Sequence, residues 1–218
     1  MASGIGRFLF GSGKKRQKQS EKTTEINDLI NTAGRLDYEL LEQQAKSNRR
    51  LFTSLVQRPV LAGSALFVGG VETVSGEQMT KLFQAKDTQP DHFAKDALER
   101  AIYPLIKNKR RGTSDQLVIG RSSDNDMVMP DYTISKHHAE IRINAEGYTI
   151  IDLGSTNGSA VNGTKLSGRQ PILLNEGDTL TLGRYQFTFM FPGLLYARLM
   201  GISLNELAAE SSSGGSGS

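Results

Sequence analysis

The chain has 218 residues, a length that fits one domain with extensions. The absence of cysteine excludes a disulfide framework and agrees with the reducing cytoplasm, which is the expected location. Hydrophobic residues make up 37% of the chain and tryptophan is absent, so part of it is expected to lie outside a packed core. The net charge of +3 belongs to the front of the chain: residues 1–58 hold 11 Lys or Arg against 6 Asp or Glu, whereas residues 113–192 hold 6 against 9.

Residues 1–22 are predicted to form a basic disordered tail. Their apolar stretch, Arg7-Phe8-Leu9-Phe10, is too short for a secretory signal and precedes the lysine-rich cluster instead of following it. A solvated tail is the simpler interpretation. The alternative is contact with a membrane surface or nucleic acid, although nucleic acid is not a partner that we expect.

Residues 23–101 are predicted to be mostly helical. From Thr24 to about Val56, apolar residues recur at steps of three and four, which places one apolar stripe along a straight helix. The stripe would either pack on the chain's own domain or mediate self-association or docking in a partner groove. The sequence leaves these alternatives open.

The second half of this region is less regular. The segment Val60–Val74 is interrupted by glycines and too short for a membrane span, so we expect a strand or a buried loop there. A capping box at Ser75-Gly76-Glu77-Gln78 predicts a helix over Glu77–Gln84, and Asp91 is a candidate cap for another over Phe93–Ala101.

Residues 102–192 read as a β-sandwich. Short runs rich in β-branched and aromatic residues alternate in polarity and are separated by Asn-Gly and Gly-Asp turns. The five clearest runs are 117–119, 139–143, 148–151, 179–182 and 185–189. We therefore predict an α+β chain in which an all-β sandwich follows a mostly helical N-terminal region.

Three short pieces of the sandwich carry polar chemistry. They are Gly120-Arg121, Ser135-Lys136-His137-His138 and Ser155-Thr156-Asn157-Gly158. Loops at one end of a sandwich can converge even when they are far apart in sequence. Converged, these pieces would offer a guanidinium, an ammonium, hydroxyls and a carboxamide, which is a receptor for a phosphate group.

The ordered set of motifs resembles the forkhead-associated (FHA) domain, a family that reads phosphothreonine peptides. The resemblance covers about residues 102–192 and is strongest at 120–126 and 135–138. It departs from the family pattern at Ser159-Ala160, where threonine and a bulky residue are common. Met127 and Met129 likewise stand where branched aliphatic residues are usual. These departures leave the expected phosphate contacts intact and bear on flanking specificity.

The resemblance implies roles for individual residues. Arg121 would pair with the phosphate, Ser135 and Thr156 would supply hydroxyls, Lys136 would add charge, and Asn157 would hold the peptide backbone. Structural support is expected from Gly120, His138 and Gly158, and a neighbouring recognition loop from Asp131–Ile134.

Each role has a simpler competitor. Arg121 could be a surface arginine at a strand end, Ser135 and Thr156 could cap turns, and Asn157 could serve as a turn residue before glycine. The histidine pair does not indicate a metal site, because adjacent strand residues point to opposite faces and the chain lacks cysteine. No metal or other cofactor is expected.

The function implied by the resemblance is that of a non-enzymatic signalling adaptor. It would link a protein phosphorylated on threonine by a Ser/Thr kinase to an assembly held by the helical N-terminal region, and self-association of that region is one way to form such an assembly. The alternative is a phospho-independent structural assembly protein whose basic N-terminus contacts membrane or nucleic acid. An enzyme is not expected, since the sequence shows no nucleophile elbow, metal-ligand set or phosphate loop.

Threonines near acidic residues suggest an internal ligand. Thr23 and Thr24 lie among Glu21, Glu25 and Asp28, and Thr88 precedes Asp91. Phosphorylation at Thr23 or Thr24 would let the chain, or a neighbouring copy, occupy its own binding site. Helix capping explains the threonine pair without any such role.

The C-terminal part is predicted to hold a short helical segment over residues 193–210, beginning at Leu194–Met200. Residues 211–218 contain only serine and glycine and read as a flexible tail.

Overall fold

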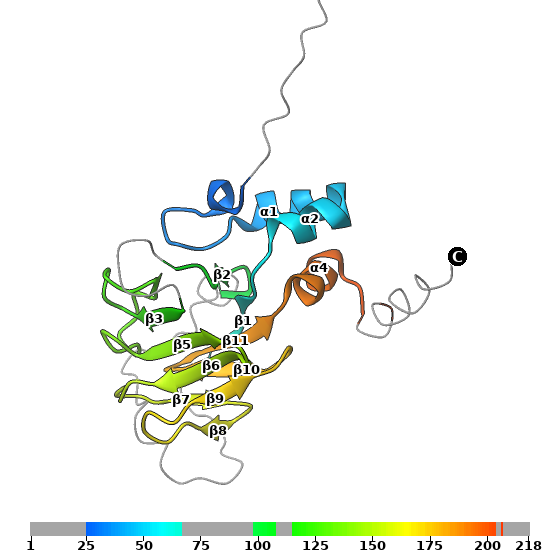
Figure 1. The fold of residues 1–218 in the computed structure, drawn as a ribbon. Coiled ribbons are helices and arrows are strands. Elements are labelled where there is room, and N and C mark those ends of the chain that lie inside the picture. Colours follow the sequence, from blue (N-terminus) through cyan, green and yellow to red (C-terminus); the bar gives the residue numbers. More distant parts are fainter. Residues whose placement is uncertain (1–24, 67–97, 108–114, 204–205, 207–218) are drawn as a thin grey trace, which may run out of the picture.

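The computed structural model describes residues 25–66, 98–107, 115–203 and 206, and its strands form two sheets (Figure 1). The six-stranded sheet has the order β2-β1-β11-β10-β7-β8, and the five-stranded sheet has the order β4-β3-β5-β6-β9. The strands are β1 (Val60–Leu66), β2 (Ile102–Pro104), β3 (Gln116–Gly120), β4 (Met127–Val128), β5 (Ala139–Asn144), β6 (Gly147–Asp152), β7 (Ser159–Val161), β8 (Thr164–Lys165), β9 (Ile172–Leu174), β10 (Thr179–Leu182) and β11 (Tyr185–Met190). The predicted α+β class with a β-sandwich is confirmed.

All five predicted runs are strands, and in β3 and β10 buried residues alternate with partly buried ones. In β3, Leu117 and Ile119 are buried whereas Val118 between them is only partly so. These two residues pack with Ile141 of β5, Leu180 of β10 and residues of β11 in the core between the sheets. The period-2 pattern therefore identified the strands that have one face on this core.

Strand β1 lies before residue 102, where the sandwich was predicted to begin. It pairs antiparallel with both β11 and β2, so it belongs to the six-stranded sheet. Leu61 packs in the core between the sheets, whereas Val60 and Ala62 pack in a second core on the outer face. Because both faces of β1 pack on a core, its sequence is mostly apolar and lacks a regular alternation of polar and apolar residues.

The single straight helix predicted over residues 24–56 is wrong. The segment forms η1 (Ile26–Leu29), α1 (Tyr38–Ser47) and α2 (Arg49–Leu55). The Asp37 side chain accepts hydrogen bonds from Glu39 N and Leu40 N and so begins α1. Asn48 has an extended φ of −164° and caps α2, which breaks the helix between the two. Local side-chain capping outweighs the continuous apolar period here.

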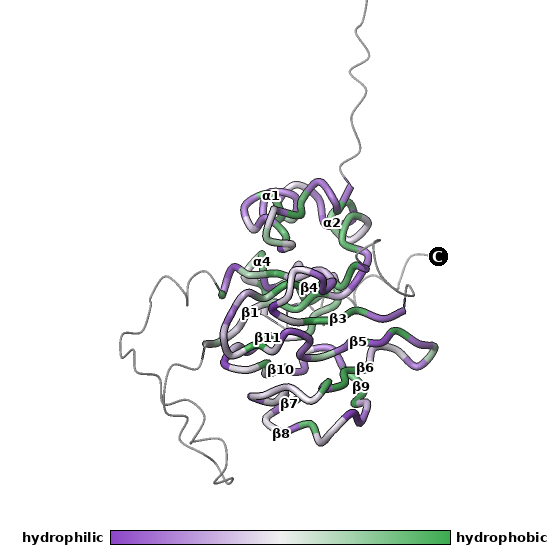
Figure 2. Tube along the Cα trace, turned by 90° about the vertical axis from the view of Figure 1, so that its left-hand side faces the viewer, coloured by the Kyte–Doolittle hydropathy of each residue, from purple (hydrophilic) through white to green (hydrophobic). Residues whose placement is uncertain are grey.

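The apolar stripe packs on the chain's own domain, which answers the alternative left open by the sequence. Helix α4 (Pro192–Met200) follows β11 directly and was predicted over nearly the same residues. Helices α1, α2 and α4 lie together at one end of the sandwich in both views (Figures 1 and 2). Their second core contains Leu29, Leu36, Leu41, Ala45, Phe52, Val56, Val60, Ala62, Ile102, Met190, Leu195 and Leu199.

This second core provides a stability prediction. Phe52 is fully buried against Tyr196, with ring centroids 5.6 Å apart, whereas its neighbour Leu51 is 63% exposed. Phe52→Ala is expected to lower the free energy of unfolding by about 3–5 kcal/mol because it leaves a cavity. Leu51→Ala should change it by no more than about 0.5 kcal/mol. Urea unfolding of both variants checks this, and equal effects would show that the helices do not pack on the sheet.

Several predicted segments lie outside the described residues. They are the basic tail 1–22, the helix 77–84, most of the helix 93–101, and the C-terminal serine and glycine stretch 211–218. Among the helices that the structure describes, none is long and apolar enough to cross a membrane.

Candidate functional site

The three predicted pieces meet at one end of the sandwich. Arg121 follows β3, Ser135 precedes β5, and Thr156 follows β6. The Arg121 backbone N–H donates to the Ser135 carbonyl at 3.0 Å. The Ser135 hydroxyl oxygen accepts a hydrogen bond from the Thr156 backbone N–H at 3.0 Å, and the two hydroxyl oxygens are 3.4 Å apart. Backbone hydrogen bonds thus bring a guanidinium-bearing residue and two hydroxyls together.

The cations of the site are available to a ligand. Arg121 and Lys136 are both exposed. Within the residues that the structure describes, neither side chain forms an ion pair, whereas Arg184 pairs with Asp131 and Lys107 pairs with Asp126. The site therefore presents positive charge that the described carboxylates do not neutralise.

Two carboxylates of the neighbouring loops, Asp152 and Asp131, are held by internal donors. Asp152 accepts hydrogen bonds from Gly154 N, Ser155 N and the hydroxyls of Ser155 and Ser159. Burial raises the pKa of Asp152, but these hydrogen bonds outweigh it and leave the pKa below its ordinary value. For Asp131, burial is likewise outweighed by donors, led by Thr133, so its pKa is also lowered.

His138 connects two of the three pieces. Its Nδ1 accepts from the Ser135 backbone N–H at 3.0 Å, and its Nε2 lies 3.1 Å from the Gly158 carbonyl oxygen. Accepting at Nδ1 and donating at Nε2 requires the neutral ring with its proton on Nε2. Burial lowers the pKa of His138, against smaller raising effects from the Gly158 carbonyl and the Asp152 charge. The fully buried ring therefore stays neutral and fixes both loops.

The same strands and loops are what a family comparison detects. The family model described as the FHA domain matches residues 117–183. This part of the chain is an FHA domain. The resemblance seen in the motifs is thereby confirmed, and the matched range contains all three pieces of the site.

Relatives of known name match the FHA domain. The oxoglutarate dehydrogenase inhibitor of Corynebacterium jeikeium is 36% identical over 74 residues, which is 33% of this chain and 47% of that protein. The glycogen accumulation regulator GarA of Mycobacterium tuberculosis H37Rv is 34% identical over 74 residues, 33% of this chain and 42% of the regulator. The matches span less than half the length of these curated relatives.

A solved structure, described as an analysis of phosphothreonine-dependent FHA domain interactions, is 30% identical. The match covers 41% of this chain and 82% of that one, with a TM-score of 0.35.

Asn125 is a supporting residue of the FHA domain that the sequence reading did not single out. Its side-chain nitrogen donates to the carbonyl oxygens of Lys136 at 2.6 Å and Ser122 at 2.8 Å. Its side-chain oxygen lies 2.8 Å from His137 Nδ1. The buried amide thereby ties the arginine loop to the serine loop. Its position four residues after Arg121 was visible in the sequence, but its contacts were not.

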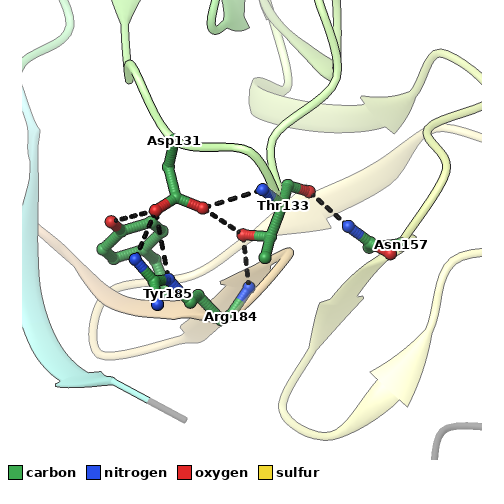
Figure 3. Close-up of polar contacts among 5 residues, drawn as sticks. All are labelled: Asp131, Thr133, Asn157, Arg184 and Tyr185. Atoms are coloured by element: carbon green, nitrogen blue, oxygen red, sulfur yellow. Dashed lines mark hydrogen bonds and ion pairs between the residues drawn. The ribbon is translucent and has the colours of Figure 1, made fainter. Parts of the chain in front are cut away.

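Asn157 lies beside the phosphate-binding pieces but contacts the recognition loop. Its side-chain nitrogen donates to the Thr133 carbonyl at 2.7 Å (Figure 3). Gly158 follows with a φ of +80°, a conformation that favours glycine, so Asn157 also precedes the glycine of a turn. Lys165 of β8, which the sequence reading also missed, places its Cε 3.1 Å from where a Cβ on Gly158 would stand.

His137 and His138 bond different partners, and the described residues contain no group of three or more metal-ligating side chains. Thr23, Thr24 and Thr88, the expected phosphorylation sites, lie outside the described residues.

The neutral His138 ring predicts a pH dependence of stability. Its folded pKa lies below the ordinary 6.5, so the unfolded chain takes up a proton first as the pH falls. The free energy of unfolding should be highest above about pH 6.5 and decline from there towards the folded pKa. Urea midpoints measured between pH 7.5 and 5.0 test this, with His138→Gln as the comparison. A variant with the same slope as the natural chain would contradict the assignment.

Proposed function

We propose that the FHA domain binds peptides containing phosphothreonine and that the chain is a non-enzymatic signalling adaptor. It links a partner phosphorylated by a Ser/Thr kinase to an assembly held by its N-terminal region. The observation that carries this proposal is the pairing of two exposed cations, Arg121 and Lys136, with the Ser135 and Thr156 hydroxyls. The carboxylates of Asp131 and Asp152 are already occupied by internal donors.

The chemistry of a phosphate monoester fits these groups. Its charge of about −1.5 to −2 and three acceptor oxygens match a guanidinium fork, an ammonium and hydroxyl donors. The hydroxyls of Ser135 and Thr156 already lie 3.4 Å apart, so a single phosphate oxygen can reach both. The names of the relatives, an inhibitor and a regulator, support a regulatory role and not a catalytic one.

The second contact of the adaptor would come from the helical part. Its apolar stripe is buried on the chain's own sheet, so a partner or a second copy would meet the opposite side of α1 and α2. The exposed residues there include Leu40, 43% exposed, and Leu51. Self-association through the N-terminal helices would use this outer side.

Selection from a peptide library tests the proposal. The full chain would be immobilised and offered a degenerate peptide pool with one fixed phosphothreonine, beside the same pool with unmodified threonine. We expect retention of the phosphorylated pool only, and the same retention by Arg142→Ala, whose arginine pairs with Glu140 on β5. Equal retention of both pools would favour the phospho-independent assembly role instead.

A further inference from the structure

A network of polar contacts holds the recognition loop, residues 131–134, and involves residues to which no phosphate contact has been assigned (Figure 3). Asp131 is its centre. One carboxylate oxygen accepts from the Thr133 backbone N–H at 2.8 Å and from the Thr133 hydroxyl at 2.6 Å. The other oxygen accepts from Arg184 Nε at 3.1 Å, from Arg184 Nη2 at 2.5 Å and from the Tyr185 hydroxyl at 2.7 Å.

The network continues from Thr133 to the peptide side of the site. Thr133 is 2% exposed, and its carbonyl accepts the side-chain N–H of Asn157. Its hydroxyl oxygen also accepts from the Arg184 backbone N–H at 3.3 Å. One continuous set of hydrogen bonds therefore runs from Arg184 through Asp131 and Thr133 to Asn157.

The turn between β10 and β11 lies in close contact with the recognition loop. A Cβ on Gly183 would stand 2.7 Å from both the carbonyl oxygen and the hydroxyl oxygen of Thr133, so no larger residue fits there without a shift. The Gly183 N–H also donates to the Gly158 carbonyl at 3.3 Å, next to Asn157. The turn thus contacts both the recognition loop and the loop that carries Asn157.

The oppositely charged side chains of Arg184 and Asp131 are both largely buried. The side chains of Arg184 and Asp131 are 24% and 8% exposed. Burial lowers the pKa of Arg184, but hydrogen bonds to Tyr185 and Asp131 outweigh it and raise the pKa overall. Both side chains therefore stay ionised, and the pair acts as a fixed ion pair and not as an acid or a base.

We propose that the Asp131–Arg184 pair is a positioning device that orients Asn157 and the Ser135 loop for the phosphopeptide. Neither residue of the pair contacts the phosphate in this assignment, which rests on the proposed function. Ser135 lies two residues after Thr133, and its backbone N–H donates to His138 Nδ1. The contacts of Thr133 and the hydrogen bond to His138 together fix the loop that carries the Ser135 hydroxyl. Removing the pair should weaken peptide binding through Asn157 while the fold persists.

A double-mutant cycle tests this. Arg184→Met keeps the aliphatic length but removes the donors, and we expect about a tenfold loss in affinity for a selected phosphothreonine peptide. In an Asn157→Ala background the same change should cost less than about twofold, because the residue that it positions is absent. The matched control is Arg142→Met, which should be additive with Asn157→Ala. An equal loss in both backgrounds would overturn the positioning role.

The variant Tyr185→Phe and the side-chain amide resonance of Asn157 provide two further tests of the positioning role. Tyr185→Phe removes one bond to Asp131 but keeps the aromatic ring, which lies 6.3 Å from that of Phe187. It should show the same non-additivity with a loss of about threefold, even where Arg184→Met does not fold. The side-chain amide resonance of Asn157 in the ligand-free chain should shift in either variant. An unchanged resonance would overturn the proposal, whereas absence of phosphopeptide binding by the natural chain would refute only the proposed function.

Discussion

Arg121→Ala is expected to lower the affinity for a phosphothreonine peptide by about 100-fold or more, since charge-assisted hydrogen bonds contribute about 1.5–3 kcal/mol each. The guanidinium fork can donate two such bonds to one phosphate, and alanine supplies none. The side chain is exposed and forms no ion pair among the described residues, so the free energy of unfolding should change by no more than about 0.5 kcal/mol. Calorimetric titration and urea unfolding measure the two quantities.

The variants Arg121→Lys and Arg142→Ala show whether the guanidinium fork of Arg121, or positive charge in general, accounts for the loss of affinity. Arg121→Lys keeps the charge but loses the fork, so its affinity should fall between those of the natural chain and Arg121→Ala. Arg142→Ala removes an arginine from β5 and should bind like the natural chain. A loss at Arg142 equal to that at Arg121 would mean that general positive charge, and not the predicted site, attracts the peptide.

Gly120→Ala is expected to destabilise the FHA domain by about 3 kcal/mol, because the added methyl overpacks a closed contact. A Cβ at residue 120 would stand 2.2 Å from the Lys136 carbonyl oxygen and 2.7 Å from the Asn125 side-chain nitrogen. Those two groups are hydrogen-bonded to each other at 2.6 Å, so the methyl would displace the loop that carries Ser135. Phosphopeptide affinity should fall together with stability. Urea midpoints and calorimetry check both expectations.

Gly193 provides the matched control for this glycine. It lies in the first turn of α4, and a Cβ there meets nothing within 4 Å. Gly193→Ala should leave the domain equally stable or more stable by up to about 1 kcal/mol, because alanine favours a helix. Tolerance of alanine at residue 120 equal to that at residue 193 would contradict the close approach of the serine loop to β3.

The sequence was most informative where one local pattern determines the structure. Strands with one face on the core, such as β3 and β10, alternate in burial and were predicted within one residue. Strand β1 was missed as part of the sandwich because both its faces are buried, which removes the alternation. The break between α1 and α2 is set by the caps at Asp37 and Asn48, and these single residues were hidden by a continuous apolar period.

In the site, too, local motifs could be recognised in the sequence, whereas contacts between distant segments could not. Short motifs indicated Arg121, Ser135 and Thr156, and the structure places them in three adjoining loops. The support behind them depends on contacts between distant segments, such as Asp131 with Arg184, 53 residues apart. No spacing rule connects an aspartate in a turn with an arginine at the start of another strand, so the sequence could not predict this pair.

The proposed adaptor binds its partner only when the threonine carries a phosphate group. The most direct test is calorimetric titration of the full chain with one peptide selected from the library, beside the same peptide with unmodified threonine. We predict binding of the phosphorylated peptide and an affinity at least about 100-fold lower for its twin, since the charge-assisted bonds are lost. Equal affinities for the two peptides, or no binding of the phosphorylated one by folded protein, would contradict the proposed function.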